Sequence, residues 1–219
     1  TLLSNYNLTT VNSTTSTITK ANITAVTGVV MNNKTYDGTT NATYNATNAG
    51  FTGMVSGDSL NVSSGSAAFG SKDAASGITV TLSNVTLGGG DVGNYQLVAN
   101  ASTVTGSATI TARAVTLTAG VQSKIYDGST VAINTVYNVT SGSFVTGEGI
   151  ANVTLVYTDK NAGAGNKTIS IANATGGTNT SLLNYNIVYT NSTASTITPK
   201  SLTVTAGAQT KTYDGTTTV

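Results

Sequence analysis

Hydrophobic and polar residues alternate with a period of two along several stretches of the chain. This period places one face of a β-strand on a core and the other in solvent, so the pattern predicts strands. Clusters of glycine, aspartate and asparagine separate these stretches and predict turns between short strands. The clearest alternating stretches are Ile18 to Thr27, Ile78 to Leu82, Val115 to Thr118, Val153 to Tyr157, Ile169 to Ile171 and Leu202 to Thr205.

Several short words recur along the chain at one spacing. Lys-x-Tyr-Asp-Gly-Thr/Ser-Thr occurs three times, and its tyrosines, Tyr36, Tyr126 and Tyr213, are 90 and 87 residues apart. The words Asn-Tyr and Val-x-Gly-Asp/Glu keep a similar step. Basic residues also recur, with Lys20, Arg113 and Lys200 in one position and Lys34, Lys124 and Lys211 in another. A period of about 90 residues is the size of a domain, because solenoid repeats run to about 20–50 residues.

The repeat predicts two complete modules, 20–111 and 112–198. Residues 1–19 are then expected to be the last strand or strands of a preceding repeat, and residues 199–219 the first strand of a following one. Because the joints between modules are too short to be flexible linkers, we expect an elongated string of modules.

The composition favours β-structure over helix or disorder. Of the 219 residues, 45 are threonine, and only 8% are charged, whereas disordered chains combine low hydrophobicity with high charge. Six or seven short strands in about 90 residues are typical of a sandwich. The predicted fold class is therefore all-β, with tandem β-sandwich-like modules that are either Ig-like or β-grasp-like.

The residues that are missing exclude several classes of function. The chain has no histidine, cysteine or tryptophan, so neither a thiolate or histidine metal site nor a Cys/Ser–His nucleophile can be built. A net charge of +1 gives no electrostatic reason to bind nucleic acid, and no apolar run is long enough to span a membrane. No pair of acids is placed for catalysis. We therefore expect a protein that is not an enzyme and uses no cofactor or metal.

The Tyr-Asp-Gly word predicts a structural turn in each copy. The aspartate is expected to accept local backbone N–H bonds while the glycine takes a positive φ, and the tyrosine rings are expected to be buried. A calcium ligand is the alternative for the aspartate, but it needs several converging oxygens. The predicted turn residues are Tyr36, Asp37, Gly38, Tyr126, Asp127, Gly128, Tyr213, Asp214 and Gly215.

Asparagine occurs in Asn-x-Ser/Thr more often than chance predicts. The motif contains 15 of the 23 asparagines, whereas random placement would give roughly 7. Strand alternation explains the threonine two residues on, but not the asparagine, which strands disfavour. The excess predicts a heavily N-glycosylated surface. The candidate sites are Asn7, Asn12, Asn22, Asn33, Asn41, Asn45, Asn61, Asn84, Asn100, Asn138, Asn152, Asn166, Asn173, Asn179 and Asn191.

Taken together, these words resemble the YDG-type repeat of large bacterial surface adhesins, the filamentous-haemagglutinin-like, two-partner-secreted proteins. The resemblance covers essentially the whole chain, from Lys-x-Tyr-Asp-Gly-Thr-Thr through Val-x-Gly-Asp and Gly-Asn-Tyr to Ala-Thr-Ile-Thr-Ala. The second module departs from it with Leu183 before Asn184-Tyr185. The resemblance implies a tandem β-module stalk at the cell surface, and it implies no binding residues.

The main hypothesis is thus the structural stalk of an extracellular, cell-surface adhesin or filament. Its partners would be neighbouring repeats of the same parent chain and covalent N-linked sugars. The first alternative is a subunit that self-assembles into a fibre or surface layer, through pairing of threonine-rich strand edges. Direct binding of host or surface glycans, or of ice through Thr-x-Thr arrays, is a weaker alternative, because turns interrupt those arrays.

Overall fold

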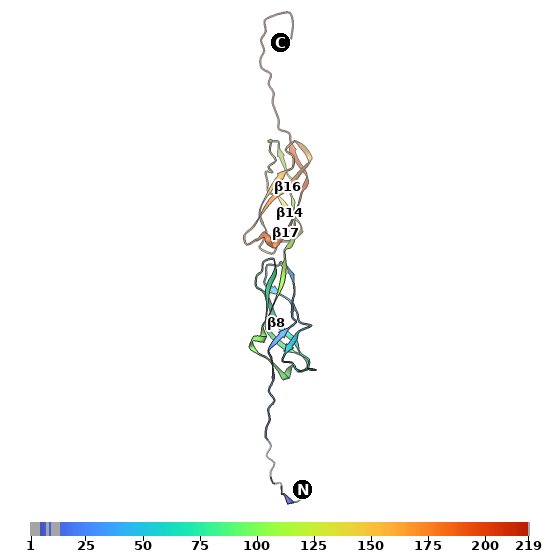
Figure 1. Cartoon of the computed structure of the whole chain (residues 1–219). Coiled ribbons are helices and arrows are strands. Elements are labelled where there is room, and N and C mark those ends of the chain that lie inside the picture. Colours follow the sequence, from blue (N-terminus) through green and yellow to red (C-terminus); the bar gives the residue numbers. More distant parts are fainter. Residues whose placement is uncertain (1–4, 8, 10–13, 219) are drawn as a thin grey trace. The chain divides into compact units, whose positions relative to one another are not determined.

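The computed structural model describes residues 5–218 except residues 8 and 10–13. β-Strands dominate these residues, and the only helices among them are short 3-10 turns (Figure 1). The prediction of an all-β chain is confirmed. The chain divides into two compact units, Thr1–Ala112 and Arg113–Val219, which are described separately.

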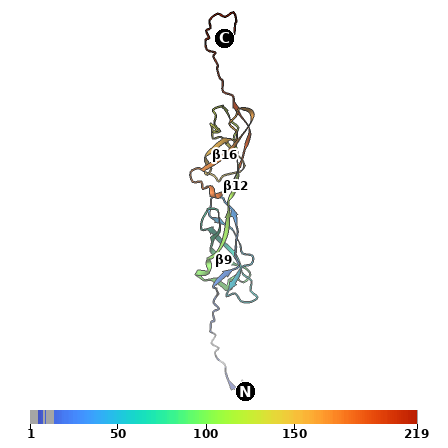
Figure 2. The same cartoon turned by 45° about the horizontal axis from the view of Figure 1, so that its top comes forward.

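Unit 1 is built around a five-stranded sheet in the order β4-β11-β9-β8-β5. Three two-stranded sheets, β1-β10, β2-β7 and β3-β6, complete it. The long strand β9 is visible in Figure 2. The elements are β1 Ala21–Ile23, β2 Ala25–Thr27, β3 Val30–Met31, β4 Lys34–Thr35, β5 Asn41–Ala42, β6 Tyr44–Asn45, β7 Gly50–Thr52, β8 Asn61–Phe69, β9 Ala75–Gly88, η2 Val92–Asn94, β10 Tyr95–Leu97, η3 Ala99–Ser102 and β11 Val104–Thr111.

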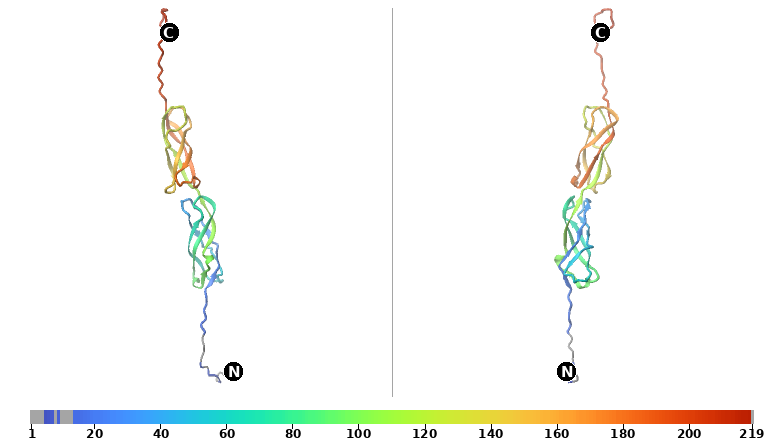
Figure 3. Two further views of the ribbon diagram at one scale, coloured as in Figure 1. Left: turned by 90° about the vertical axis from the view of Figure 1, so that its left-hand side faces the viewer. Right: turned by 45° about the vertical axis from the view of Figure 1, so that its right-hand side comes forward.

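Unit 2 has two larger sheets, a four-stranded one in the order β13-β18-β16-β15 and a three-stranded one in the order β14-β12-β17. Within each unit the longer strands lie roughly along one axis, and neighbouring strands are parallel in some pairs and antiparallel in others (Figure 3). The elements are β12 Arg113–Ala119, β13 Ser123–Ile125, β14 Tyr137–Gly142, β15 Ile150–Tyr157, β16 Gly163–Gly176, η4 Leu182–Asn184, β17 Tyr185–Thr190 and β18 Ser192–Thr198.

Each unit has its own apolar core, supplied by alternate residues of its strands. In unit 2, Val115 and Leu117 of β12 are buried, as are Val153 of β15, Ile169 of β16 and Ile197 of β18. The corresponding core of unit 1 is made by Ile23, Phe69, Val80, Leu82 and Ile110. Strand β16 of the four-stranded sheet lies against β12 and β17 of the three-stranded sheet, so buried residues of both sheets contribute to one core.

The strand pairing shows which residues of the two units are equivalent, and this alignment differs by one residue from the one that places Lys20 and Arg113 at the same position. Ala21 pairs with Tyr95 in unit 1, and Arg113 pairs with Tyr185 in unit 2. Arg113 therefore occupies the position of Ala21, not that of Lys20. Two glycines support this register. Gly53 and Gly142 have φ of 101° and 70°, and a Cβ on either would clash with the carbonyl oxygen of Asn22 or Ala114.

One predicted strand does not form. Leu202 to Thr205 alternate as β12 does, but residues 199–218 contain no strand, and Leu202 and Val204 are 86% and 91% exposed. β12 is a strand because β14 and β17 pair with it on both sides. The described chain offers residues 202–205 no such neighbours. The start of the stretch Ile18 to Thr27 is likewise no strand, since β1 begins at Ala21. Whether residues 1–19 and 199–219 belong to adjoining repeats stays a prediction.

Candidate functional site

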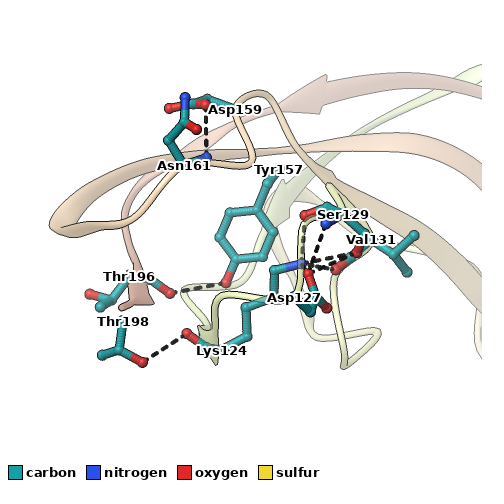
Figure 4. A network of polar contacts seen from close by, with 9 residues as sticks. All are labelled: Lys124, Asp127, Ser129, Val131, Tyr157, Asp159, Asn161, Thr196 and Thr198. Carbon is teal, nitrogen blue, oxygen red and sulfur yellow. Dashed lines mark hydrogen bonds and ion pairs between the residues drawn. The ribbon is translucent and has the colours of Figure 1, made fainter. Parts of the chain in front are cut away.

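The ammonium group of Lys124 is the centre of the Lys-x-Tyr-Asp-Gly loop in unit 2 (Figure 4). It donates hydrogen bonds to Asp127 Oδ1 at 2.9 Å, to the carbonyl of Ser129 at 2.8 Å and to the carbonyl of Val131 at 3.0 Å. It also lies 5.3 Å from the centre of the Tyr157 ring. Only 1% of the lysine side chain is exposed. A buried charge requires such partners, so the loop is folded around its lysine.

The other two copies of the loop have the same arrangement. Lys34 Nζ lies 2.7 Å from Asp37 Oδ1 and 2.7 Å from the carbonyl of Thr39, and it lies over the Phe69 ring. Lys211 Nζ lies 2.8 Å from Asp214 Oδ1, although no strand surrounds it. The lysine three residues before the aspartate is thus a fixed part of the turn. Its constant spacing is visible in the sequence, but the turn pattern alone predicts only backbone partners for the aspartate.

The aspartates also accept the backbone N–H two residues on, with N–O distances of 2.9, 2.9 and 3.0 Å for Asp37, Asp127 and Asp214. The glycine that follows each aspartate has φ of 78–80°. The Lys124 hydrogen bond, followed by the Ser129 N–H, lowers the pKa of Asp127 from 3.8 to about 2. The same two kinds of contact lower the pKa of Asp214. For Asp37, burial raises the pKa, but the bonds from Lys34 and Thr39 outweigh it and the pKa is lowered.

The tyrosine rings of the turn do not share one environment. Tyr36 is 1% exposed, whereas Tyr126 is 37% and Tyr213 is 92% exposed. The expectation of three buried rings is therefore wrong for Tyr126 and Tyr213. What Tyr36 and Tyr126 share is a backbone contact, because their N–H groups donate to the carbonyls of Thr111 and Thr198 at 2.9 and 2.8 Å. The repeated position thus fixes the main chain of the tyrosine and leaves the burial of its ring to the surroundings.

A second pair of repeated words meets in space. The Tyr185 hydroxyl donates to Glu148 Oε2 at 2.6 Å and accepts the N–H of Val145 at 3.0 Å. In unit 1, Tyr95 makes the same two contacts with Asp58 and Val55, at 2.5 and 3.0 Å. The acid and the tyrosine are 37 residues apart in both units. Burial and then the Glu148 hydrogen bond raise the pKa of Tyr185 to about 12. The hydrogen bond from Tyr95 to Asp58 likewise raises the pKa of Tyr95.

The predicted glycosylation sites are at the surface. Fourteen of the fifteen asparagines lie in the described residues, and all fourteen are exposed; Asn12 lies outside them. They come from strands and loops of both units. Exposure permits modification, but most described asparagines outside the motif, such as Asn48 and Asn161, are exposed as well.

Two of these asparagines have a backbone reason to be asparagine. Asn84 and Asn179 have φ of 55° and 62°, a left-handed conformation that asparagine tolerates better than other side chains. Asn84 lies in β9 where the pairing with β8 shifts between Ser64 and Ser66, so it forms part of a bulge. The objection that strands disfavour asparagine therefore has a structural answer at Asn84.

The other charged side chains of the described residues do not gather into one site. Asp159 accepts hydrogen bonds from Lys167 Nζ at 2.5 Å and from the N–H of Asn161 at 2.9 Å, and its pair with Lys167 is a second type of ion pair that the sequence did not predict. Within the part of the chain that the structure describes, no three acidic, histidine or cysteine side chains are grouped to hold a metal. No helix there is long and apolar enough to cross a membrane. The repeated polar side chains thus contact one another and the main chain.

The comparison with known families agrees with this organisation. The sequence pattern of the YDG domain matches twice, at residues 18–105 and 111–194. No curated protein and no solved structure is similar enough to count as a match. The two matches fall on the two units, and together they cover most of the 219 residues. The chain therefore belongs to the YDG domain family, of which it contains two tandem copies.

Proposed function

We propose that the chain is the structural stalk of an extracellular bacterial adhesin or surface filament, and that N-linked sugars cover much of its surface. It performs no catalysis. Its function depends on the length of the stalk and on the chemistry of its surface. Its immediate partners are neighbouring YDG repeats of the same parent chain.

The observation that carries the proposal is the use of the repeated polar residues in both units. The lysine and aspartate of each loop bind each other, and the buried tyrosines bind the acids Asp58 and Glu148. These are the residues a catalytic or ligand-binding repeat would present to solvent. Here the lysines and tyrosines are largely covered and the aspartates lie at the surface, but all of them are bound to one another, which supports a module whose repeated residues maintain structure.

A sugar coat follows from the other polar residues. Fourteen exposed motif asparagines lie on a chain with only 8% charged residues. Few charges leave little to keep copies of a protein apart in solution, and hydrophilic sugars on asparagine would supply that hydration.

We further propose that each unit is a sandwich-like module of the Ig type. In unit 2, residues of both sheets share one core, as the two layers of a sandwich do. The β-grasp alternative is less well supported, because such a fold packs an α-helix on its sheet. The only helices among the described residues are short 3-10 turns.

The test is peptide-level mass spectrometry of the protein from its native source, with the same chain from a host that lacks N-glycosylation as control. We expect sugar-sized mass increments on several of the motif asparagines. Protease treatment of intact cells should release the same peptides. Unmodified peptides from the native source would contradict the proposed sugar coat. Full protection of the chain from protease in intact cells would contradict the proposed surface location.

One observation favours self-assembly as a second candidate. Leu202 and Val204 are exposed on a segment that alternates like a central strand but pairs with no strand among the described residues. Such a segment could add to a sheet edge of another copy. Electron microscopy of the purified chain separates the two: regular end-to-end or lateral contacts favour assembly, and isolated particles favour the stalk.

A further inference from the structure

The first and last segments of each unit lie side by side and run parallel. In unit 2, β12 pairs with β17 over six residues, from Arg113–Tyr185 to Thr118–Thr190. Further along the same two segments, β13 pairs with β18 over three residues, from Ser123–Thr196 to Ile125–Thr198. The offset between partners changes by a single residue, so one parallel seam runs from the first strand of the unit to its last strand.

Additional hydrogen bonds close this seam. The Tyr126 N–H donates to the Thr198 carbonyl at 2.8 Å, and the Thr196 N–H donates to the Gln122 carbonyl at 2.9 Å. The Thr198 hydroxyl donates to the Lys124 carbonyl at 3.1 Å. The Lys124 ammonium is itself held in the buried Lys-x-Tyr-Asp-Gly loop. The seam therefore ends at a segment that cannot slide without disrupting the bonds of the lysine ammonium.

Parallel pairing of the first and last segments decides how the unit resists tension. A pull on the two ends draws these segments along their own axes in opposite directions. The hydrogen bonds between them lie across the strands and are therefore loaded together, in shear. In an antiparallel hairpin pulled apart at its open end, the bonds are instead loaded one after another.

We propose that each YDG unit is a tension-bearing element, and that the parallel seam between its first and last segments is its mechanical clamp. The inference deepens the proposed stalk function, because a stalk that holds a cell to a surface carries tension along its chain. It depends on pairing inside each unit alone.

The two units have seams of different length. In unit 1, β1 pairs with β10 over three residues and β4 pairs with β11 over two. η3 follows β10 in unit 1 where β17 continues as a strand in unit 2. The seam of unit 2 thus contains more paired residues, so unit 2 is the stronger of the two.

The experiment is single-molecule force spectroscopy on the full chain. Because the sequence has no cysteine, introduced pairs define the direction of pull. Asn5→Cys with Thr218→Cys loads both seams. Ala151→Cys with Thr178→Cys, at two exposed positions next to the open end of the β15–β16 hairpin, unzips unit 2 from the side. Forced unfolding reports the unfolding rate, and we expect the seam direction to need about twofold more force or greater. Equal forces in the two directions would overturn the clamp.

Hydroxyl deletions supply a matched pair of variants. Thr190→Val with Thr198→Val removes seam bonds to the carbonyls of Leu117 and Lys124, together with the bond between the hydroxyls of Thr118 and Thr190. Thr158→Val with Thr175→Val removes comparable bonds within the β15–β16 hairpin. Only the seam variant should lower an unfolding force, and it should lower the higher of the two force peaks, which identifies that peak as unit 2. If the hairpin variant lowers the force as much, or the seam variant lowers the weaker peak, the assignment is wrong.

These results separate the clamp from the stalk. A chain whose unfolding force is independent of direction can still be a surface stalk by the mass-spectrometry and protease tests. If the unfolding force is high and depends on direction, but the chain is protected from protease inside intact cells, the clamp is supported and the surface stalk is contradicted.

Discussion

Lys124 and Asp127 form an ion pair at 2.9 Å in which the lysine side chain is 1% exposed and the aspartate side chain 51% exposed. The cation is thus buried and the anion faces solvent. The two partners therefore have different roles: the lysine anchors the loop to the buried part of the unit, and the aspartate carboxylate remains solvated. Lys34 is 17% exposed in the equivalent pair of unit 1. We therefore expect the loss of this ion pair to reduce the stability of unit 2 more than that of unit 1.

Lys124→Met should destabilise unit 2, because the carbonyls of Ser129 and Val131 lose their donor while the apolar stem is kept. We expect the free energy of unfolding to fall by about 1–3 kcal/mol. Chemical denaturation followed by circular dichroism measures it. Lys160→Met, at an exposed position, serves as control and should change stability by less than about 0.5 kcal/mol. An equal effect of the two variants would mean that the buried ammonium does not hold the loop.

Acid should weaken unit 2 through Asp127. Its pKa is about 2 in the folded chain and 3.8 without its partners, so the folded state favours the carboxylate. The stabilisation is therefore complete above pH 3.8 and is lost as the pH falls towards 2. Melting temperatures across this range should fall less steeply in Asp127→Asn, which has no titrating carboxylate. Parallel pH profiles of the variant and the original chain would contradict this role.

Tyr185→Phe should lower the stability of unit 2 by about 1–2 kcal/mol, because the hydroxyl that accepts from the Val145 N–H and donates to Glu148 is removed. Tyr6→Phe, at a 72% exposed position, is the neutral control. The pH dependence runs opposite to that of Asp127. The pKa of Tyr185 is raised from 10.0 to about 12, so its contribution is present below pH 10 and is lost as the pH rises towards 12. The pKa values of Tyr95 and Tyr157 are raised as well, so absorbance of tyrosinate during alkaline titration should show one late-ionising tyrosine fewer in the variant than in the original chain.

Gly142→Ala should be strongly destabilising, since the left-handed φ of 70° and the nearby Ala114 carbonyl both oppose a Cβ. A loss of about 1–3 kcal/mol is expected from the backbone conformation alone. Gly147→Ala separates the two causes, because its φ is 86° but nothing lies within 4 Å of the added Cβ. Thermal unfolding should rank Gly142→Ala as clearly worse. The opposite ranking would argue against the pairing of Gly142 with Val115 between β14 and β12.

Local features of the fold could be predicted from the sequence. Two-residue alternation located β12, β15 and β16, because burial on one side of a strand needs no knowledge of its partner. The Asp–Gly turn is equally local, since its carboxylate and N–H are two residues apart. Even the Lys–Asp pair forms in the isolated copy at Lys211 and Asp214, over three residues.

Contacts between distant residues could not be predicted in this way. The tyrosine–acid contacts join residues 37 apart, and their constant spacing indicates a shared role without stating a distance in space. Tyr36 and Tyr126 occupy the same position of the Lys-x-Tyr-Asp-Gly word but differ in exposure, because burial depends on what the rest of the fold places over a ring.

The sequence by itself determined that this chain is a duplicated, strand-forming protein with Asp-Gly turns, because alternation and turn chemistry act over a few residues. Only the tertiary structure decided which strands exist and which of them lie together. Leu202 to Thr205 alternate like β12 yet form no strand, since a strand is stable only when its N–H and C=O groups have partners. The parallel seam joins segments about 72 residues apart in the chain and arises from that pairing alone.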